Sequence, residues 1–437
     1  MTADLHEPDS LVAADVAQLL PSAALAGALV RATAEQVASF ADFGRPRALV
    51  VIGANAAVDA ALLTALVGDL PAPVVTGTRL PSWVGPLDIV VVFASVIDDI
   101  ACAESAAQAA RRGARVIVRT AADGPVADAA AGSVLLFPTV PVTEALAGAA
   151  RLTVLIGVAA AAGFVRRPDF SVAADQLDAL AVACHPSSEF FINPALTLAE
   201  HLSDGTPLVI GTDPVADALA GYACRSLAAL AGYAGAALLS YQAAGSPPVL
   251  ASAARTGGPA GTFYDPFLAE ATATSDAGQI VSSVLVVGPS AQGTTSSSGG
   301  PSVGLPAGSG LLPLESLPMF GSGPVDPTRT PATPHSPLAA ALHAALPRAM
   351  SIGPEELPTP GQPPEGVESL PSRDAFSWTL AMMARIDFAA VYLGLRAGAR
   401  PPMDSPDGLG RPGSAALHLP STGGRAAWSE RESGSWS

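Results

Sequence analysis

The strongest constraint on the fold of this chain is a series of short, continuously apolar segments that alternate with helical patterns. Residues 47–53 (RALVVIG), 88–95 (DIVVVFAS) and 114–120 (ARVIVRT) have the length of strands and are bordered by Pro, Asp or Gly. Strands without polar alternation are buried on both faces, which is typical of parallel sheets covered by helices on both sides. The alternation therefore predicts an α/β fold with parallel strands.

The same pattern recurs in the second half of the chain, with expected strands at residues 207–211, 236–241 and 281–287. Two α/β units are predicted, near residues 41–140 and 190–290. Their strand–Gly–helix openings, VVIGANAAVDAAL and LVIGTDPVADALA, are alike and indicate an internal duplication.

The composition of the sequence changes after residue 288. Ser, Gly, Pro and Thr dominate there, and apolar periodicity is lost except over residues 338–346. Such a composition cannot bury enough apolar surface to offset the entropy of ordering. Residues 373–396 (RDAFSWTLAMMARIDFAAVYLGLR) are amphipathic again and predict a helix that docks on the folded body. We expect an N-terminal helical segment (1–40), two α/β domains (41–165 and 166–290), a disordered low-complexity span (291–372), a docking helix (373–398) and a disordered tail (399–437).

Charge and hydropathy exclude several classes of function. The 437 residues carry a formal charge of −16, and all 22 basic residues are Arg. An acidic chain without basic clusters is a poor nucleic-acid binder, and a chain without Lys cannot form a lysine Schiff base. The N-terminus is acidic, and the apolar run at residues 152–165 is shorter than the roughly 20 residues of a membrane span. We expect a cytoplasmic protein that contacts neither membrane nor nucleic acid.

In parallel α/β sheets, ligands bind at the carboxyl ends of the strands, so the turns there are the first candidates for a site. These turns contain Ser95 and Asp98, Gly53 and Asn55, and Thr212. Backbone N–H groups at the following helix starts suit a phosphate. Helix capping explains the same residue types, and we favour capping, because two acids near Ser95 would repel a phosphate.

Other catalytic signals are sparse. Glu189 lies just before Asn193-Pro194 and a predicted helix, and it would serve as a general base only if it faced a cleft; a capping or solvated acid is the simpler interpretation. The six histidines show no metal-binding spacing, and the Gly53 turn has too few glycines for a dinucleotide fingerprint. We expect neither a metal nor a cofactor.

Four segments in order resemble the sugar-isomerase (SIS) family, and specifically its bifunctional phosphoglucose/phosphomannose isomerases. They are residues 80–95 (LPSWVGPLDIVVVFAS), 106–118 (AAQAARRGARVIV), 191–212 (with FINPALTLAEHL and PLVIGT) and 382–398 (MMARIDFAAVYLGLRAG). The resemblance implies two tandem flavodoxin-like sandwiches, a C-terminal helix, an active site between domains, a hexose-6-phosphate ligand and a homodimer.

The catalytic positions of that family are altered in this sequence. The Ser/Gly/Asn/Thr phosphate loop is replaced by residues 94–99 (ASVIDD), the family's "NPAK" lacks its Lys, and no His occurs at residues 241–249. The carboxylate expected just before the Asn-Pro pair is missing, and Glu189 is the nearest acid. Aldose–ketose isomerisation needs a base, a ring-opening acid and phosphate donors, so the resemblance extends to the fold but not to the catalytic groups.

Three hypotheses remain open from the sequence. The first is a degenerate SIS protein that binds a sugar phosphate, contacted by Gly53, Asn55, Ser95, Asp98, Asn193 and Thr212, with little or no isomerase activity. The second is a working glucose-6-phosphate/mannose-6-phosphate isomerase with Glu189 as its base. The third is a non-catalytic interaction protein that pairs subunits through the apolar face of residues 376–395.

Overall fold

The fold is described from a computed structural model, in which residues 3–96, 98–130, 132–203, 205–256, 282–288, 337–346, 348–353 and 375–399 are described. The chain divides into two compact units, Met1–Met403 and Asp404–Ser437. The second unit and the tail predicted from residue 400 onward lie outside the described residues. Everything below concerns the first unit.

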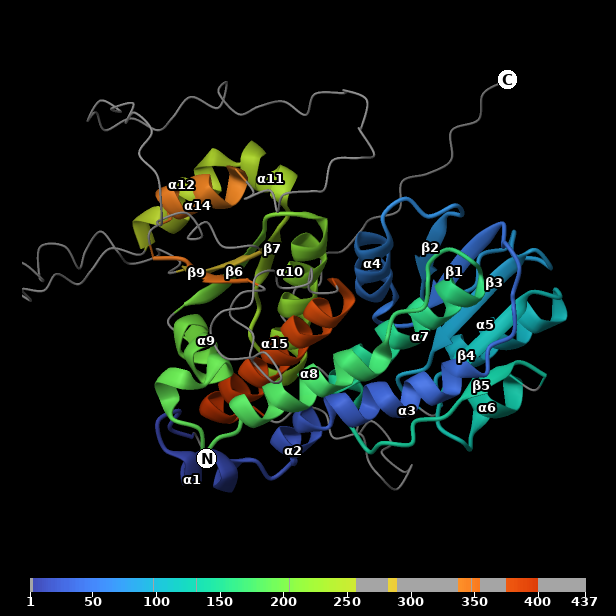
Figure 1. The fold of residues 1–437 in the computed structure, drawn as a ribbon, viewed down its shortest axis with the longest axis horizontal. Coiled ribbons are helices and arrows are strands. Elements are labelled where there is room, and N and C mark those ends of the chain that lie inside the picture. Colours follow the sequence, from blue (N-terminus) through green and yellow to red (C-terminus); the bar gives the residue numbers. More distant parts are fainter. Residues whose placement is uncertain are drawn as a thin grey trace, which may run out of the picture. The chain divides into compact units, whose positions relative to one another are not determined.

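The first sheet is built from five parallel strands in the order β2-β1-β3-β4-β5 (Figure 1). The central strands β1 and β3 are buried at every position, and their side chains are apolar on both faces except for Asp88 at the start of β3. In the register, Val50 of β1 pairs with Val75 on one side and Val90 on the other. The strands are β1 (Ala48–Ile52), β2 (Val74–Gly77), β3 (Asp88–Phe93), β4 (Arg115–Arg119) and β5 (Val134–Leu136), and the helices between them are α4 (Ala56–Val67), α5 (Ile100–Arg111) and α6 (Pro125–Ala129).

The second sheet has four parallel strands in the order β7-β6-β8-β9. Strand β6 holds the position in this sheet that β1 holds in the first, and each leads through a turn into a helix, as the duplicated sequence openings predict. The elements are β6 (Thr206–Gly211), α10 (Pro214–Ser226) with its π-helical continuation η3 (Leu227–Ala231), β7 (Ala236–Leu238), α11 (Ser240–Gly245), α12 (Pro247–Thr256), β8 (Ser282–Val287), α14 (Pro337–Ala345) and β9 (Met350–Ile352).

Two expectations need correction here. The strand predicted over residues 236–241 ends at Leu238, because helix α11 begins at Ser240. The span 291–372 is not wholly without structure: α14 lies in it, and β9 completes the sheet by pairing Ser351 with Val286 of β8. Strand β9 has only three residues, too few for a periodic pattern to reveal it in the sequence. The remainder of that span lies outside the described residues.

A layer of helices joins the two sheets into a single core. The largest buried cluster contains Leu49 and Val51 of the first sheet together with Val209 and Leu285 of the second. Helix α3 packs on α7 and α8, and α4 packs on α10. These connecting elements are α1 (Pro8–Ala14), α2 (Leu19–Ala24), α3 (Ala26–Ala38), η1 (Glu144–Leu146), α7 (Gly148–Ala161), α8 (Phe170–Ala183), η2 (Phe190–Ile192) and α9 (Pro194–Ser203).

The C-terminal helix α15 (Ala375–Ala397) docks on the folded body, as predicted. It packs against α8, α9 and α10 (Figure 1), and every residue from Phe376 to Leu395 is buried. Its length and apolar composition would also suit a membrane span, but its whole apolar window is enclosed by the protein, as in a core helix. The apolar face assigned to subunit pairing in the third hypothesis is therefore already covered by the chain's own helices.

Candidate functional site

The turn after β1 brings the backbone of two strands unusually close together. Gly53 has a φ of +147°, and a Cβ atom on it would overlap the carbonyl oxygen of Phe93 at the end of β3. Its N–H donates to the carbonyl oxygen of Gly77 at 3.0 Å. Gly53 thus holds the carboxyl ends of β1, β2 and β3 together, and only glycine fits there.

Asn55 occupies the N-cap position of α4, as the sequence suggested, but Ser95 does not cap α5. Asn55 precedes α4, but its side chain makes no capping hydrogen bond. Helix α5 is capped by Asp99, which accepts from the N–H of Cys102 at 3.0 Å, whereas Asp98 is exposed. Ser95 is half-buried, and its hydroxyl makes no hydrogen bond within the described residues. The side chains of Asn55 and Ser95, at the carboxyl edge of the first sheet, are therefore not engaged in capping.

The equivalent turn of the second sheet is closed by its own side chains. Thr212 is buried and donates to the carbonyl oxygen of Val287 at 3.1 Å. Asp213 caps α10 by accepting from the N–H groups of Val215 and Ala216. The candidate turns are thus related by duplication, but the groups at the second are taken up by structural hydrogen bonds.

Asn193 and Glu189 belong to the second half of the chain. Asn193 is fully buried: its side chain accepts from the N–H groups of Ala195 and Leu196 and donates to the carbonyl oxygen of His185. Glu189 is exposed at the start of η2. No hydrogen bond or ion pair of the described residues joins Glu189 or Asn193 to Gly53, Asn55 or Ser95. Asn193 therefore acts as a helix cap.

A buried ion cluster lies next to the first turn, and the sequence patterns did not reveal it. Arg151 of α7 is fully buried and donates to Asp59 of α4 at 2.8 Å and to Glu144 of η1 at 2.7 Å. Arg119, at the end of β4, donates to the other oxygen of Glu144 at 3.0 Å. Burial alone would lower the pKa of Arg151, but the attraction of Asp59 and Glu144 outweighs it and raises that pKa. The arginine is therefore permanently charged.

A second buried group lies between α10 and α15. The hydroxyls of Tyr222 and Ser226 both donate to the carboxylate of Asp387, at 2.7 and 2.5 Å. Burial raises the pKa of Asp387 to about 6, although both hydrogen bonds and the charge of Arg225 oppose that rise. Asp387 falls within the segment that resembles the C-terminal helix of the SIS family, and here it anchors that helix.

Arg225 is the residue that connects the two halves at the candidate turn. Its guanidinium lies over the ring of Tyr222, 4.9 Å from the centroid. It reaches Asn55 Oδ1 and the carbonyl oxygen of Ala145, both at 3.4 Å, which is long for an N–H···O bond. Its Nε is buried and has no hydrogen-bond partner. Arg225 is therefore a partly buried cation with spare donors beside Asn55.

These groups suit the binding of an anion better than proton transfer. Arg225, Asn55 and the N-terminal end of α4 offer hydrogen-bond donors and positive potential at the carboxyl edge of the first sheet. In the described part of the chain, no three His, Cys, Asp or Glu side chains are grouped so that they could hold a metal ion. The sequence did carry a signal for the buried ion cluster: Asp59 and Arg151 are charged residues inside otherwise apolar helices.

Comparisons with known proteins identify relatives by structure only. No protein-family profile matches the chain, and no curated protein matches it in sequence. A hypothetical protein from Thermus thermophilus is similar in structure, with a TM-score of 0.53 and 13% identity, over 90% of this chain and 89% of that one.

Two further structures are less similar. The C-terminal domain of glucosamine-fructose-6-phosphate aminotransferase from Francisella tularensis has a TM-score of 0.48 and 8% identity, over 88% of this chain and 96% of that one. A protein from Clostridium novyi NT, named as a putative tagatose-6-phosphate ketose/aldose isomerase, has a TM-score of 0.47 and 9% identity, with 92% of each chain covered.

The likeness at these identities concerns the fold. The two parallel sheets, their corresponding strand orders and the docked C-terminal helix are those that the sequence resemblance implied. The chain therefore has a fold of two parallel α/β sheets, similar to that of the Thermus thermophilus protein.

Proposed function

We propose that this protein binds a sugar phosphate at the carboxyl edge of its first sheet and has little or no isomerase activity. The observation that carries the proposal is Arg225, whose Nε is buried without a partner and whose guanidinium makes only two long hydrogen bonds beside Asn55. A phosphate there would accept hydrogen bonds from the Nη groups of Arg225, whose present bonds to Asn55 and Ala145 are long, and Ser95 follows the neighbouring strand β3. The resemblance to sugar-phosphate isomerases supplies the ligand class.

The proposal of weak or absent catalysis rests on the missing acid–base groups. The sequence has no Lys, and no His occurs at residues 241–249, where the family resemblance would place one. Glu189, the remaining acid near the Asn-Pro pair, is exposed and makes no hydrogen bond or ion pair with Arg225 or Asn55 in the described structure. A base without a partnered acid cannot complete an aldose–ketose proton transfer.

Thermal unfolding across a panel of hexose 6-phosphates tests the binding proposal. A ligand at 100 times its dissociation constant should stabilise the protein by about 2.7 kcal/mol. Arg225→Gln should remove most of this stabilisation, whereas Arg111→Gln, a charge change at the exposed end of α5, should leave it unchanged. A melting temperature that no hexose phosphate alters would refute the proposal.

A coupled isomerase assay separates the proposal from the active-enzyme alternative. We expect no turnover of glucose 6-phosphate or mannose 6-phosphate above background. Turnover that Glu189→Gln abolishes would establish the alternative, with Glu189 as the base.

The resemblance also implies a homodimer, which we propose for the full chain. Light scattering after size-exclusion chromatography distinguishes a mass of twice 43.5 kDa from that of a monomer.

A further inference from the structure

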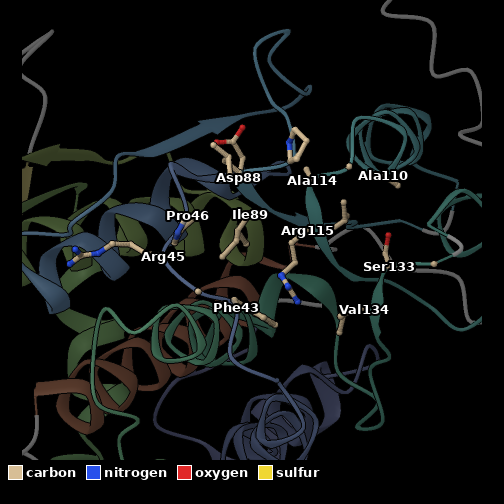
Figure 2. A pocket seen from close by; sticks show the side chains of 16 residues that line it. Phe43, Arg45, Pro46, Asp88, Ile89, Ala110, Ala114, Arg115, Ser133 and Val134 are labelled. Atoms are coloured by element: carbon tan, nitrogen blue, oxygen red, sulfur yellow. The ribbon is translucent and has the colours of Figure 1, made fainter.

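A pocket of about 470 Å³ opens at the amino-terminal ends of the first sheet's strands. It is lined by residues that precede or begin β1, β3, β4 and β5, among them Pro46, Asp88, Arg115 and Val134 (Figure 2). Because the strands are parallel, this edge is opposite to the one that holds Gly53 and Ser95. The volume is in the range of small-molecule pockets, and the pocket is separate from the candidate site above.

Arg115 presents unused hydrogen-bond donors in this pocket. Its guanidinium lies over the ring of Phe43, 4.8 Å from the centroid. Both residues are labelled in Figure 2. Stacking fixes the plane of a guanidinium and leaves its N–H groups free. Among the described residues, Arg115 makes no ion pair and no side-chain hydrogen bond, unlike Arg47 and Arg119. A planar fork of donors suits a carboxylate or a phosphate.

Ser133 lines the same pocket beside Val134. Its hydroxyl oxygen is inaccessible to solvent and has no hydrogen-bond partner among the described residues, so a ligand in the pocket would not reach it without a movement of the wall.

The one carboxylate in the wall does not cancel this positive character. Asp88 accepts from Arg47 Nε at 3.0 Å, from Arg47 Nη2 at 2.6 Å and from the N–H of Gly85 at 2.8 Å. Burial raises the pKa of Asp88, but these hydrogen bonds outweigh burial and hold the pKa below its usual value. Asp88 is therefore ionised and neutralised by Arg47, and Arg115 remains without a counter-charge. Arg45 extends away from Arg115 at the side of the pocket (Figure 2).

We propose that this pocket binds the oxyanion group of a small metabolite, a carboxylate or a phosphate monoester, through the guanidinium of Arg115. The apolar wall formed by Pro46, Ile89 and Val134 accommodates the remainder of the molecule. This site is independent of the proposed sugar-phosphate site, because none of its lining residues takes part in that site.

Titration calorimetry of the full chain with inorganic phosphate and with malonate tests the proposal. At least one probe should bind, and Arg115→Gln should weaken that binding at least about tenfold, as expected for a charge-assisted pair. Arg111→Gln, the matched control on the adjacent helix end, should bind as the parent does. Phosphate binding alone indicates a phosphate ester as the natural ligand, and malonate binding alone indicates a carboxylate.

Arg225→Gln should leave probe binding at this pocket intact, which separates the two sites. The proposal is overturned if neither probe binds, if Arg111→Gln weakens binding as much as Arg115→Gln, or if only Arg225→Gln weakens it.

Discussion

At the scale of single residues, charges buried beside the candidate site distinguish this protein from a simple apolar sandwich. Arg151, Asp59 and Glu144 are brought together from α7, α4 and η1, and the Arg151 side chain is wholly inaccessible to solvent. Such a cluster is costly to desolvate, but removing one member costs more, because its partner charges then stay buried without compensation. It therefore fixes the position of α4, whose N-terminal end carries Asn55.

Arg151→Met should lower the free energy of unfolding by about 3–5 kcal/mol, the usual cost of leaving a buried charge unpaired. Urea unfolding at pH 7 measures the effect. The matched control is Arg31→Met, because Arg31 also contacts two carboxylates, Asp175 and Asp178, but at the surface. That control should lose no more than about 1 kcal/mol. Equal losses in the two variants would show that the buried cluster has no special role.

Asp387 makes stability depend on pH in the opposite sense to an ordinary salt-bridged acid. Its pKa of about 6 in the folded protein exceeds the ordinary value of 3.8, so the folded state binds more protons between these values. Stability contributed by this group is therefore present at low pH and is lost as pH rises through about 6.

Relative to Asp387→Asn, the parent protein should lose on the order of 2 kcal/mol of stability between pH 4.5 and pH 7. Urea unfolding of both proteins at the two pH values gives this difference. A constant difference between them would mean that the pKa of Asp387 is the same in the folded and unfolded states, and therefore that its burial does not raise that pKa.

At the scale of elements, two helical glycines differ in how closely their surroundings pack against them. A Cβ on Gly394 of α15 would overlap the backbone carbonyl oxygen of Leu230 in η3, whereas a Cβ on Gly221 of α10 would meet nothing within 4 Å. Helix propensity favours alanine at both positions, so any difference between the two must come from packing.

Gly394→Ala should destabilise the protein by about 1–3 kcal/mol, because the backbone of η3 cannot move aside as a flexible side chain would. Gly221→Ala should stabilise it by about 0.5–1 kcal/mol through its better helix propensity. Thermal unfolding of the two variants checks both signs. Stabilisation by Gly394→Ala would show that α15 does not approach η3 so closely.

The elements also show how far the sequence pattern could be followed. Strands β1, β3 and β4 were predicted to within one or two residues, because an unbroken apolar run bounded by turn residues is a local signal. Strand β9 was missed, because three residues inside a Ser/Gly/Pro-rich span carry no period. Asn55 was predicted as a cap and occupies the N-cap position of α4, but without a side-chain hydrogen bond; Ser95 was also interpreted as a cap, but the cap of α5 is Asp99.

At the scale of the whole molecule, the two sheets are not independent folding units. One buried cluster includes Leu49 of the first sheet, Leu285 of the second and Leu393 of α15. Helices α3, α7, α8 and α15 pack across this common core. A domain boundary such as the one expected at residue 165 therefore separates the two sheets along the chain, although both sheets contribute to the same buried cluster.

Both halves should consequently unfold in one transition. Trp83 reports on the first half and Trp378 on α15. Variants that lack Trp428 and Trp436 and keep only one of these two tryptophans should show the same urea midpoint by fluorescence. The shared core provides the physical reason, since neither sheet can lose its packing without exposing the other. Two separate midpoints would contradict a common core.

The sequence by itself determined the α/β class, the parallel strands, the duplicated architecture and the docked C-terminal helix, because apolar periodicity and turn residues act within a few positions along the chain. Only the tertiary structure decided which polar groups meet at the candidate site. Arg151 and Asp59 are 92 residues apart, and Arg225 and Asn55 are 170 apart. No local pattern records such pairings, because these residues meet only when α4 packs against α7 and α10 in the folded protein.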